Sequence, residues 1–233
     1  MNRIAENIQA VHERIITAAG ASGRTAEEIM LLAISKNFPE ESISQAASAG
    51  LRCFGENRVQ EAEGKILHFR EVLNLEWHLV GHLQSNKARR AAELFDVIHS
   101  LDSIRLGAKL NQASLEIGKT MSALIQVDLG KEDTKSGVDS SQVREIVEGL
   151  SKFRNLRING LMTIPPFFEN PVDARPFFAQ LRKLRDLLEQ ENPGCLGQQQ
   201  LSMGMSHDFE IAIQEGATII RVGTAIFGSR HYG

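Results

Sequence analysis

The sequence is poor in the residues that build disulfide frameworks, zinc sites and membrane spans. Its two cysteines, Cys53 and Cys195, form no C-x-x-C pair and stand near no regular set of histidines. Disulfide and zinc frameworks are therefore poorly supported, and we expect a reducing, cytoplasmic location. Residues 1–19 carry charges throughout, unlike the apolar core of a signal peptide or a membrane span. We expect neither export nor a membrane partner.

Charge of one sign is not concentrated in any segment. The 26 basic and 29 acidic residues are interspersed, and the formal net charge is −3. No basic stripe could follow a phosphate backbone, so nucleic acid is not an expected partner. Hydrophobic residues make up 42% of the 233 positions, which is enough to bury a full core. A single domain over residues 1–233 is expected, and the lack of a long apolar surface segment favours a monomer.

Short apolar runs alternate with longer amphipathic segments along most of the chain. The runs are rich in β-branched or aromatic residues and predict eight strands, at 31–35, 53–55, 77–81, 97–101, 123–129, 158–162, 200–203 and 219–223. Before them, Ile4, Ile8, Val11 and Ile15 recur at helical spacing. This order predicts an α/β fold, a single (β/α)8 TIM-type barrel with an additional N-terminal helix. An open doubly wound sheet is the alternative.

A lysine follows the first predicted strand. In such barrels the functional residues gather at the carboxyl ends of the strands, so Lys36 is expected at the barrel mouth. A partly desolvated lysine has a lowered pKa, and more of it is the neutral amine that attacks an aldehyde. Taken alone, however, Lys36 is better explained as an ordinary surface lysine at the start of a loop, since lysine is mostly exposed.

The last two predicted strands end in turns of glycine and small residues. Residues 201–206 read LSMGMS and residues 221–225 read RVGTA. Backbone N–H groups and hydroxyls in such turns suit a phosphate dianion, and phosphates commonly bind beside these strands of a barrel. The alternative is that Gly204 and Gly223 only make tight turns.

Polar residues after the second and third strands are candidates for the wall of a pocket. Asn57, His82 and Asn86 are such residues, although Asn and His also cap helices and hold loops. His78 and His82 have no third ligand at metal-binding spacing, so we expect no metal site.

Longer stretches match a known family: LLAISK, FGENRVQE, WHLVGHLQSNK, IHSLDS, the TKSG of 134–137, GLMTI, LSMGMSHDFEIAI and RVGTAIFGSR. They resemble the YggS/PROSC family of pyridoxal phosphate homeostasis proteins, which are similar to the barrel domain of alanine racemase. The resemblance covers nearly the whole chain. Three positions depart from the usual pattern: Asn37 follows the lysine, Arg58 follows FGEN, and Asp128 follows QV. Of these, Arg58 is expected to alter the wall of the pocket.

The resemblance implies pyridoxal 5'-phosphate as the cofactor and a role for particular residues. Lys36 would hold the cofactor as a Schiff base, and Asn57 would lie beside its ring. Arg221 would lie near the pyridine nitrogen. The phosphate would be held by Ser206, Gly223 and Thr224, with Ser202 and Met203 lining that end of the pocket.

This site favours holding the cofactor over catalysis. An arginine near the pyridine nitrogen disfavours protonation of the ring, which weakens it as an electron sink. In alanine racemase one of the two acid/base groups is a tyrosine from a second domain, whereas the single tyrosine here is Tyr232 near the end of the chain. We expect a protein that binds pyridoxal phosphate reversibly and takes part in vitamin B6 and amino-acid homeostasis. Pyridoxal-phosphate-dependent apoenzymes would be the recipients. Lys135 is a candidate second amine for transfer, although a solvated loop lysine is the favoured interpretation. A racemase of low activity and a sugar-phosphate enzyme are the alternatives.

Overall fold

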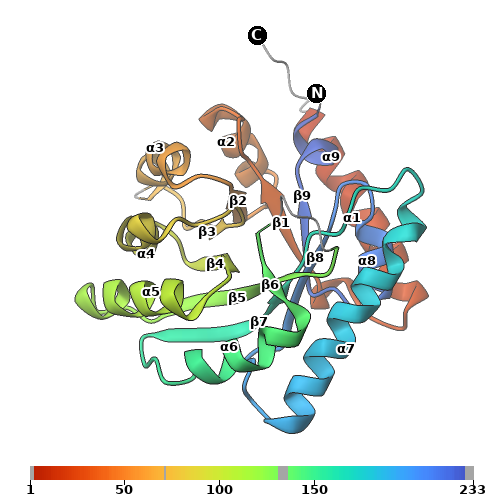
Figure 1. Ribbon diagram of the computed structural model, residues 1–233. Coiled ribbons are helices and arrows are strands. Elements are labelled where there is room, and N and C mark those ends of the chain that lie inside the picture. The colour runs from red at the N-terminus through yellow and green to blue at the C-terminus, as the bar shows by residue number, and fades with distance from the viewer. Residues whose placement is uncertain (1–2, 71, 131–135, 229–233) are drawn as a thin grey trace.

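Eight parallel strands close into a barrel in the computed structural model, which describes residues 3–70, 72–130 and 136–228 (Figure 1). The strands are β1 (Met30–Ile34), β2 (Cys53–Glu56), β3 (Glu76–Leu79), β4 (Val97–Leu101), β5 (Met121–Asp128), β7 (Leu156–Met162), β8 (Gln200–Met205) and β9 (Ile219–Val222). They are hydrogen-bonded in the order β4-β3-β2-β1-β9-β8-β7-β5, and β4 also pairs with β5. This closure confirms the predicted TIM-type barrel and excludes the open sheet. A short strand, β6 (Val138–Asp139), was not predicted; it extends the sheet beside the end of β5.

Helices surround the barrel in Figure 1. They are α1 (Arg3–Ala21), α2 (Glu40–Ser48), α3 (Val59–Phe69), α4 (Ala88–Leu94), α5 (Ile104–Glu116), α6 (Val143–Leu150), α7 (Arg175–Glu191), α8 (Phe209–Gln214) and α9 (Thr224–Phe227). The additional N-terminal helix is confirmed as α1, which buries Ile8, Val11 and Ile15. It packs on α8 and α9, where Arg14 pairs with Glu210 at 2.7 Å. Within the described ranges, no helix is long and apolar enough to cross a membrane.

Strand residues alternate between two apolar layers. One large cluster fills the space between the strands and the helices. A smaller cluster lies inside the barrel and contains Leu32, Ile34, Val80, Leu124, Met162 and Ile219. Because neighbours along a strand point to opposite faces, each strand contributes alternate residues to the barrel interior. Polar side chains at inward positions are therefore enclosed by the barrel.

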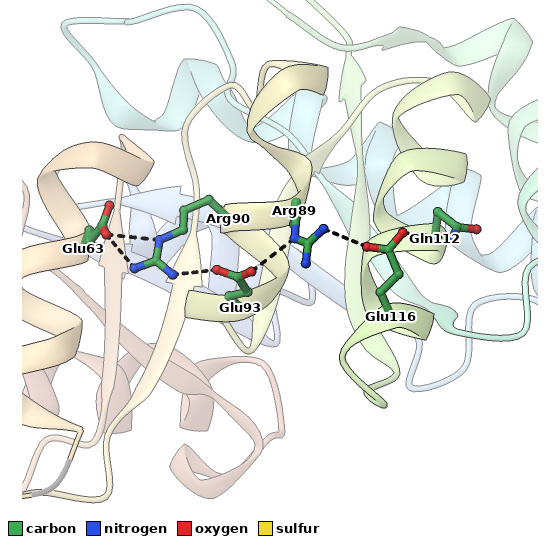
Figure 2. Close-up of polar contacts among 6 residues, drawn as sticks. All are labelled: Glu63, Arg89, Arg90, Glu93, Gln112 and Glu116. Atoms are coloured by element: carbon green, nitrogen blue, oxygen red, sulfur yellow. Dashed lines mark hydrogen bonds and ion pairs between the residues drawn. The ribbon is translucent and has the colours of Figure 1, made fainter.

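A chain of ion pairs joins three neighbouring helices on the outer surface (Figure 2). Arg90 of α4 binds Glu63 of α3 and Glu93 of its own helix. Arg89 continues the chain to Glu93 at 3.5 Å and to Glu116 of α5 at 3.1 Å. These side chains are partly exposed, so each pair stabilises the fold by about 1 kcal/mol or less.

Candidate functional site

Lys36 lies directly after β1, at the carboxyl end of the barrel. It lines a cavity of about 370 Å³, within the usual range of about 300–1,000 Å³ for small-molecule sites. The other lining residues are Asn57, Val80, Gly81, His82, Gln126, Val127, Asp128, Ser136, Ile164 and Met205. They come from several strand ends and from the loops that follow, including the Pro-rich loop that begins after β7. The predicted position of Lys36 at the barrel mouth is confirmed.

The backbone around Lys36 is held by a buried ion pair. Lys65 Nζ lies 2.9 Å from Glu56 Oε1 and donates to the Ser35 carbonyl, also at 2.9 Å. The Ser35 hydroxyl donates to the same Glu56 oxygen at 2.7 Å. On the other side of Lys36, the Asn37 N–H donates to Glu61 Oε1 at 2.5 Å, and Asn37 adopts a left-handed φ of 63°. The residues on both sides of Lys36 are therefore fixed.

Glu56 is fully buried, and burial raises its pKa against the opposing effect of Lys65. Sequence reasoning missed this pair. A signal was present, because Lys65 falls among Ala62, Ile66 and Phe69 on the buried face of α3. A lysine on the apolar face of a helix indicates a buried partner.

Asn57 and His82 form one wall of the cavity. A Cβ atom on Gly81 would lie 2.2 Å from the Asn57 carbonyl oxygen, so only glycine lets the two loops approach this closely. His82 is exposed, and its Nδ1 lies 3.5 Å from Asp102 Oδ2. Arg58 is also exposed and lines the neighbouring cavity with Asn57 and His82, whereas the cavity of Lys36 does not include it.

The two glycine-containing turns lie side by side at the mouth. Ser206 Oγ accepts the N–H groups of Gly223 at 3.2 Å and Ala225 at 3.4 Å, which joins the turn after β8 to the turn after β9. Gly223 is half-buried and Thr224 is exposed. Because β9 pairs with β1, these donors lie at the end of the strand next to Lys36. The structure thus brings together Lys36, Ser206, Gly223 and Thr224.

Arg221 lies inside the barrel with only 4% of its surface exposed. Its Nη1 donates to Ser202 Oγ at 2.7 Å, and its Nη2 donates to the Thr163 carbonyl at 2.8 Å. Burial lowers the pKa of Arg221 to about 10, so the guanidinium remains charged at neutral pH. Ser202 also lies 2.9 Å from His99 Nδ1. Burial first, and then the charges of His78 and Arg221, hold the pKa of His99 well below its usual value.

Among the predicted site residues, Lys36 and Asn57 line the cavity itself, whereas Met203 faces away from the barrel interior. Its side chain is fully buried in the cluster between the strands and the helices. Ser202 precedes it and points inward to Arg221, so Met203 points outward by the alternation of the strand. Two further residues of interest, Lys135 and Tyr232, lie outside the described residues.

Comparison with known proteins places the chain in a family. A family model described as alanine racemase, N-terminal domain, matches residues 2–231. The pyridoxal phosphate homeostasis protein of Aquifex aeolicus (strain VF5) is 44% identical over 227 residues, covering 97% of this chain and 98% of that protein. The protein of the same name from Escherichia coli (strain K12) is 42% identical over 234 residues, covering 100% and 99%.

Solved structures agree with this assignment. PipY of Synechococcus elongatus PCC7942, solved with PLP bound, is 40% identical, with a TM-score of 0.86 over 97% of this chain and 100% of that chain. Alanine racemase from Corynebacterium glutamicum has a TM-score of 0.74 over 98% of this chain and 61% of its own, but at 17% identity it supports the fold alone. The chain belongs to the pyridoxal phosphate homeostasis protein family, on the fold of the alanine racemase N-terminal domain.

Proposed function

We propose that this protein binds pyridoxal 5'-phosphate at the barrel mouth and takes part in the homeostasis of that cofactor without efficient catalysis. The observation that carries the proposal is the meeting of Lys36 with the Ser206–Gly223 turn at the ends of the paired strands β1 and β9. An amine and a set of N–H and hydroxyl donors at one mouth suit a small molecule that carries an aldehyde and a phosphate. The PLP bound in PipY gives independent support.

The residues present fit this cofactor. The cavity at Lys36 has the volume of a small-molecule site, and the turn beside it offers half-buried and exposed donors. In the proposal Lys36 would hold the cofactor through its amine, as a Schiff base with the aldehyde. Ser206, Gly223 and Thr224 hold the phosphate, and Asn57 lies beside the ring. When bound, the cofactor supplies an electrophilic carbon that exchanges between amines.

Arg221 and Ser202 set the electrostatics of the pocket. A guanidinium is a donor only and keeps its charge, so beside the pyridine nitrogen it opposes protonation of the ring. Ser202 holds Arg221 in place through a 2.7 Å hydrogen bond. Met203 supports the pocket indirectly, because its side chain packs in the apolar cluster on the outer face of β8. Carbanion chemistry is weak in such a pocket.

The protein then acts as a reversible carrier and not as a racemase. Relatives that match along the whole chain carry the homeostasis name, whereas the racemase likeness extends to the fold. In this proposal the protein is a cytoplasmic monomer that passes the cofactor to pyridoxal-phosphate-dependent apoenzymes. Transfer exchanges the bond to Lys36 for a bond to another amine.

The test is the absorption spectrum of the purified protein with pyridoxal phosphate. Wild type should show the visible band of a lysine-bound cofactor, and borohydride should trap the cofactor on Lys36. Lys36→Ala should lose both. Lys87→Ala is the matched control, since Lys87 lines the neighbouring cavity, and it should keep both. An unchanged band in Lys36→Ala would refute the site.

A chirality assay separates the carrier from a weak racemase. Holoprotein incubated with several L-amino acids should leave them in the L-form. Robust conversion to the D-form that disappears in Lys36→Ala would overturn the non-catalytic proposal.

A further inference from the structure

A continuous chain of polar side chains crosses the interior of the barrel. Arg221 of β9 donates to Ser202 of β8 at 2.7 Å, and Ser202 Oγ lies 2.9 Å from His99 Nδ1 on β4. His99 Nε2 lies 2.8 Å from His78 Nδ1 on β3, and His78 Nε2 lies 3.0 Å from Glu76 Oε1. Every link has the length of a good hydrogen bond.

The two ends of the chain lie at opposite ends of the barrel. Glu76 is the first residue of β3, and its side chain is 43% exposed. Arg221 lies toward the mouth, since its Nη2 binds the carbonyl of Thr163, which follows β7. The middle of the chain is enclosed, because His78, His99 and Ser202 are each at most 1% exposed. The chain thus links solvent at the amino ends of the strands to Arg221 inside the barrel.

The charged ends determine where each proton lies. The carboxylate of Glu76 only accepts, so His78 must carry its hydrogen on Nε2. A neutral His78 then accepts at Nδ1, which requires His99 to donate from Nε2 and to accept at Nδ1. The hydroxyl of Ser202 must donate to that nitrogen, which leaves its lone pairs for Arg221. All donors point from Arg221 toward Glu76.

We propose that His78 and His99 are positioning residues that hold Ser202, and through it Arg221, in one hydrogen-bonded orientation set by Glu76. The proposal rests on the proposed function for its effect on the cofactor, but not for the proton arrangement itself.

Charged and titratable groups on neighbouring strands and loops act on this chain. Glu76 faces His78 from its own strand, and Cys53 of β2 contacts the second Glu76 oxygen at 3.7 Å. The hydrogen bond from His78 is the main cause that lowers the pKa of Glu76, so Glu76 is ionised at neutral pH. The remaining groups that act on the chain are Asp96 near Cys53, Arg221 beside His99, and Asp208 near Arg221. The pKa of His99 is held well below its usual value, so His99 is neutral in this arrangement.

The first experiment follows the ring nitrogens by NMR in cofactor-free protein labelled with 15N-histidine. His78→Gln and His99→Gln assign the two rings by loss of signals. At neutral pH both rings should carry hydrogen on Nε2 only.

Glu76→Gln keeps an acceptor for His78 but removes the charge. It should disturb the proton arrangement, because the amide of Gln can donate to His78 as well as accept from it. Glu40→Gln is the matched control, because Glu40 forms an exposed pair with His68 at 3.4 Å, and it should leave both tautomers in place. A His99 ring with its hydrogen on Nδ1 at neutral pH, or tautomers unchanged by Glu76→Gln, would overturn the chain.

The second experiment loads wild type, Glu76→Gln and Glu40→Gln with pyridoxal phosphate and compares their visible bands. Glu76→Gln should shift the band, and Glu40→Gln should leave it in place. A band that Glu76→Gln leaves unmoved would show that the chain does not reach the cofactor. Failure to bind cofactor would refute the proposed function, and the NMR result would still decide the proton arrangement.

Discussion

Replacing Lys65, the buried cation that binds Glu56 and the Ser35 carbonyl next to Lys36, should destabilise the protein strongly. Glu56 is fully buried and Lys65 is 8% exposed, with 2.9 Å between Nζ and Oε1. At that distance the attraction is about 6 kcal/mol for an effective dielectric constant of about 20. Much of this offsets the cost of taking both charges out of water. Breaking one side of a buried pair costs about 3–5 kcal/mol, which is the loss of unfolding free energy expected for Lys65→Met at neutral pH.

The loss should depend on pH in a defined direction. Burial raises the pKa of Glu56 in the folded protein, and Lys65 opposes that shift. Without Lys65 the folded protein holds the Glu56 proton more tightly than the unfolded chain does. Its stability therefore falls as pH rises through the raised pKa of Glu56. The difference between Lys65→Met and wild type should be smallest near pH 4 and largest near pH 8.

The assay is urea unfolding of four proteins at both pH values: wild type, Lys65→Met, Glu56→Gln and the double variant. The double variant should recover part of the lost stability, because the uncompensated charge is gone. Lys109→Met, at an exposed position of α5, controls for the change of residue type. A loss below about 1 kcal/mol at pH 8, or no recovery in the double variant, would refute the reasoning.

Three further results are expected. Gly81→Ala should lower the free energy of unfolding by about 1–3 kcal/mol, because the new Cβ meets the Asn57 oxygen at 2.2 Å; urea unfolding measures this. Burial raises the pKa of Cys53 to about 12 and that of Cys195 to about 11, so at pH 8 a thiol reagent should label both far more slowly in the folded protein than in urea. Arg90→Ala should shift the urea midpoint by the equivalent of about 1 kcal/mol or less, since its ion pairs are partly exposed; a larger shift would contradict the surface argument.

The barrel could be predicted because each strand has a recognisable local sequence pattern. Apolar runs bounded by turn residues mark all eight strands, and the carboxyl-end rule then places Lys36 and the two turns at one mouth. The tertiary structure was needed only to show that β4 and β5 pair and close the sheet.

The interior polar chain could not be predicted because it depends on register. His78, His99 and Ser202 come from β3, β4 and β8, and only closure of the barrel turns them toward one another. The same alternation separates Ser202 from Met203. The family resemblance implied that both line the pocket, but a step of one residue along a strand moves the Met203 side chain to the opposite face.

The two parts of the pocket, Lys36 after β1 and the turn after β9, are also made at different times during synthesis. A ribosome completes the strand before Lys36 long before it makes the strand before Gly223, yet the two lie side by side with Ala33 opposite Val222. A growing chain therefore displays the lysine without the turn that accompanies it. The pocket is complete only once β9 lies between β8 and β1. Under the proposed function, a nascent chain that still lacks β9 has the amine but not the turn that would hold the phosphate.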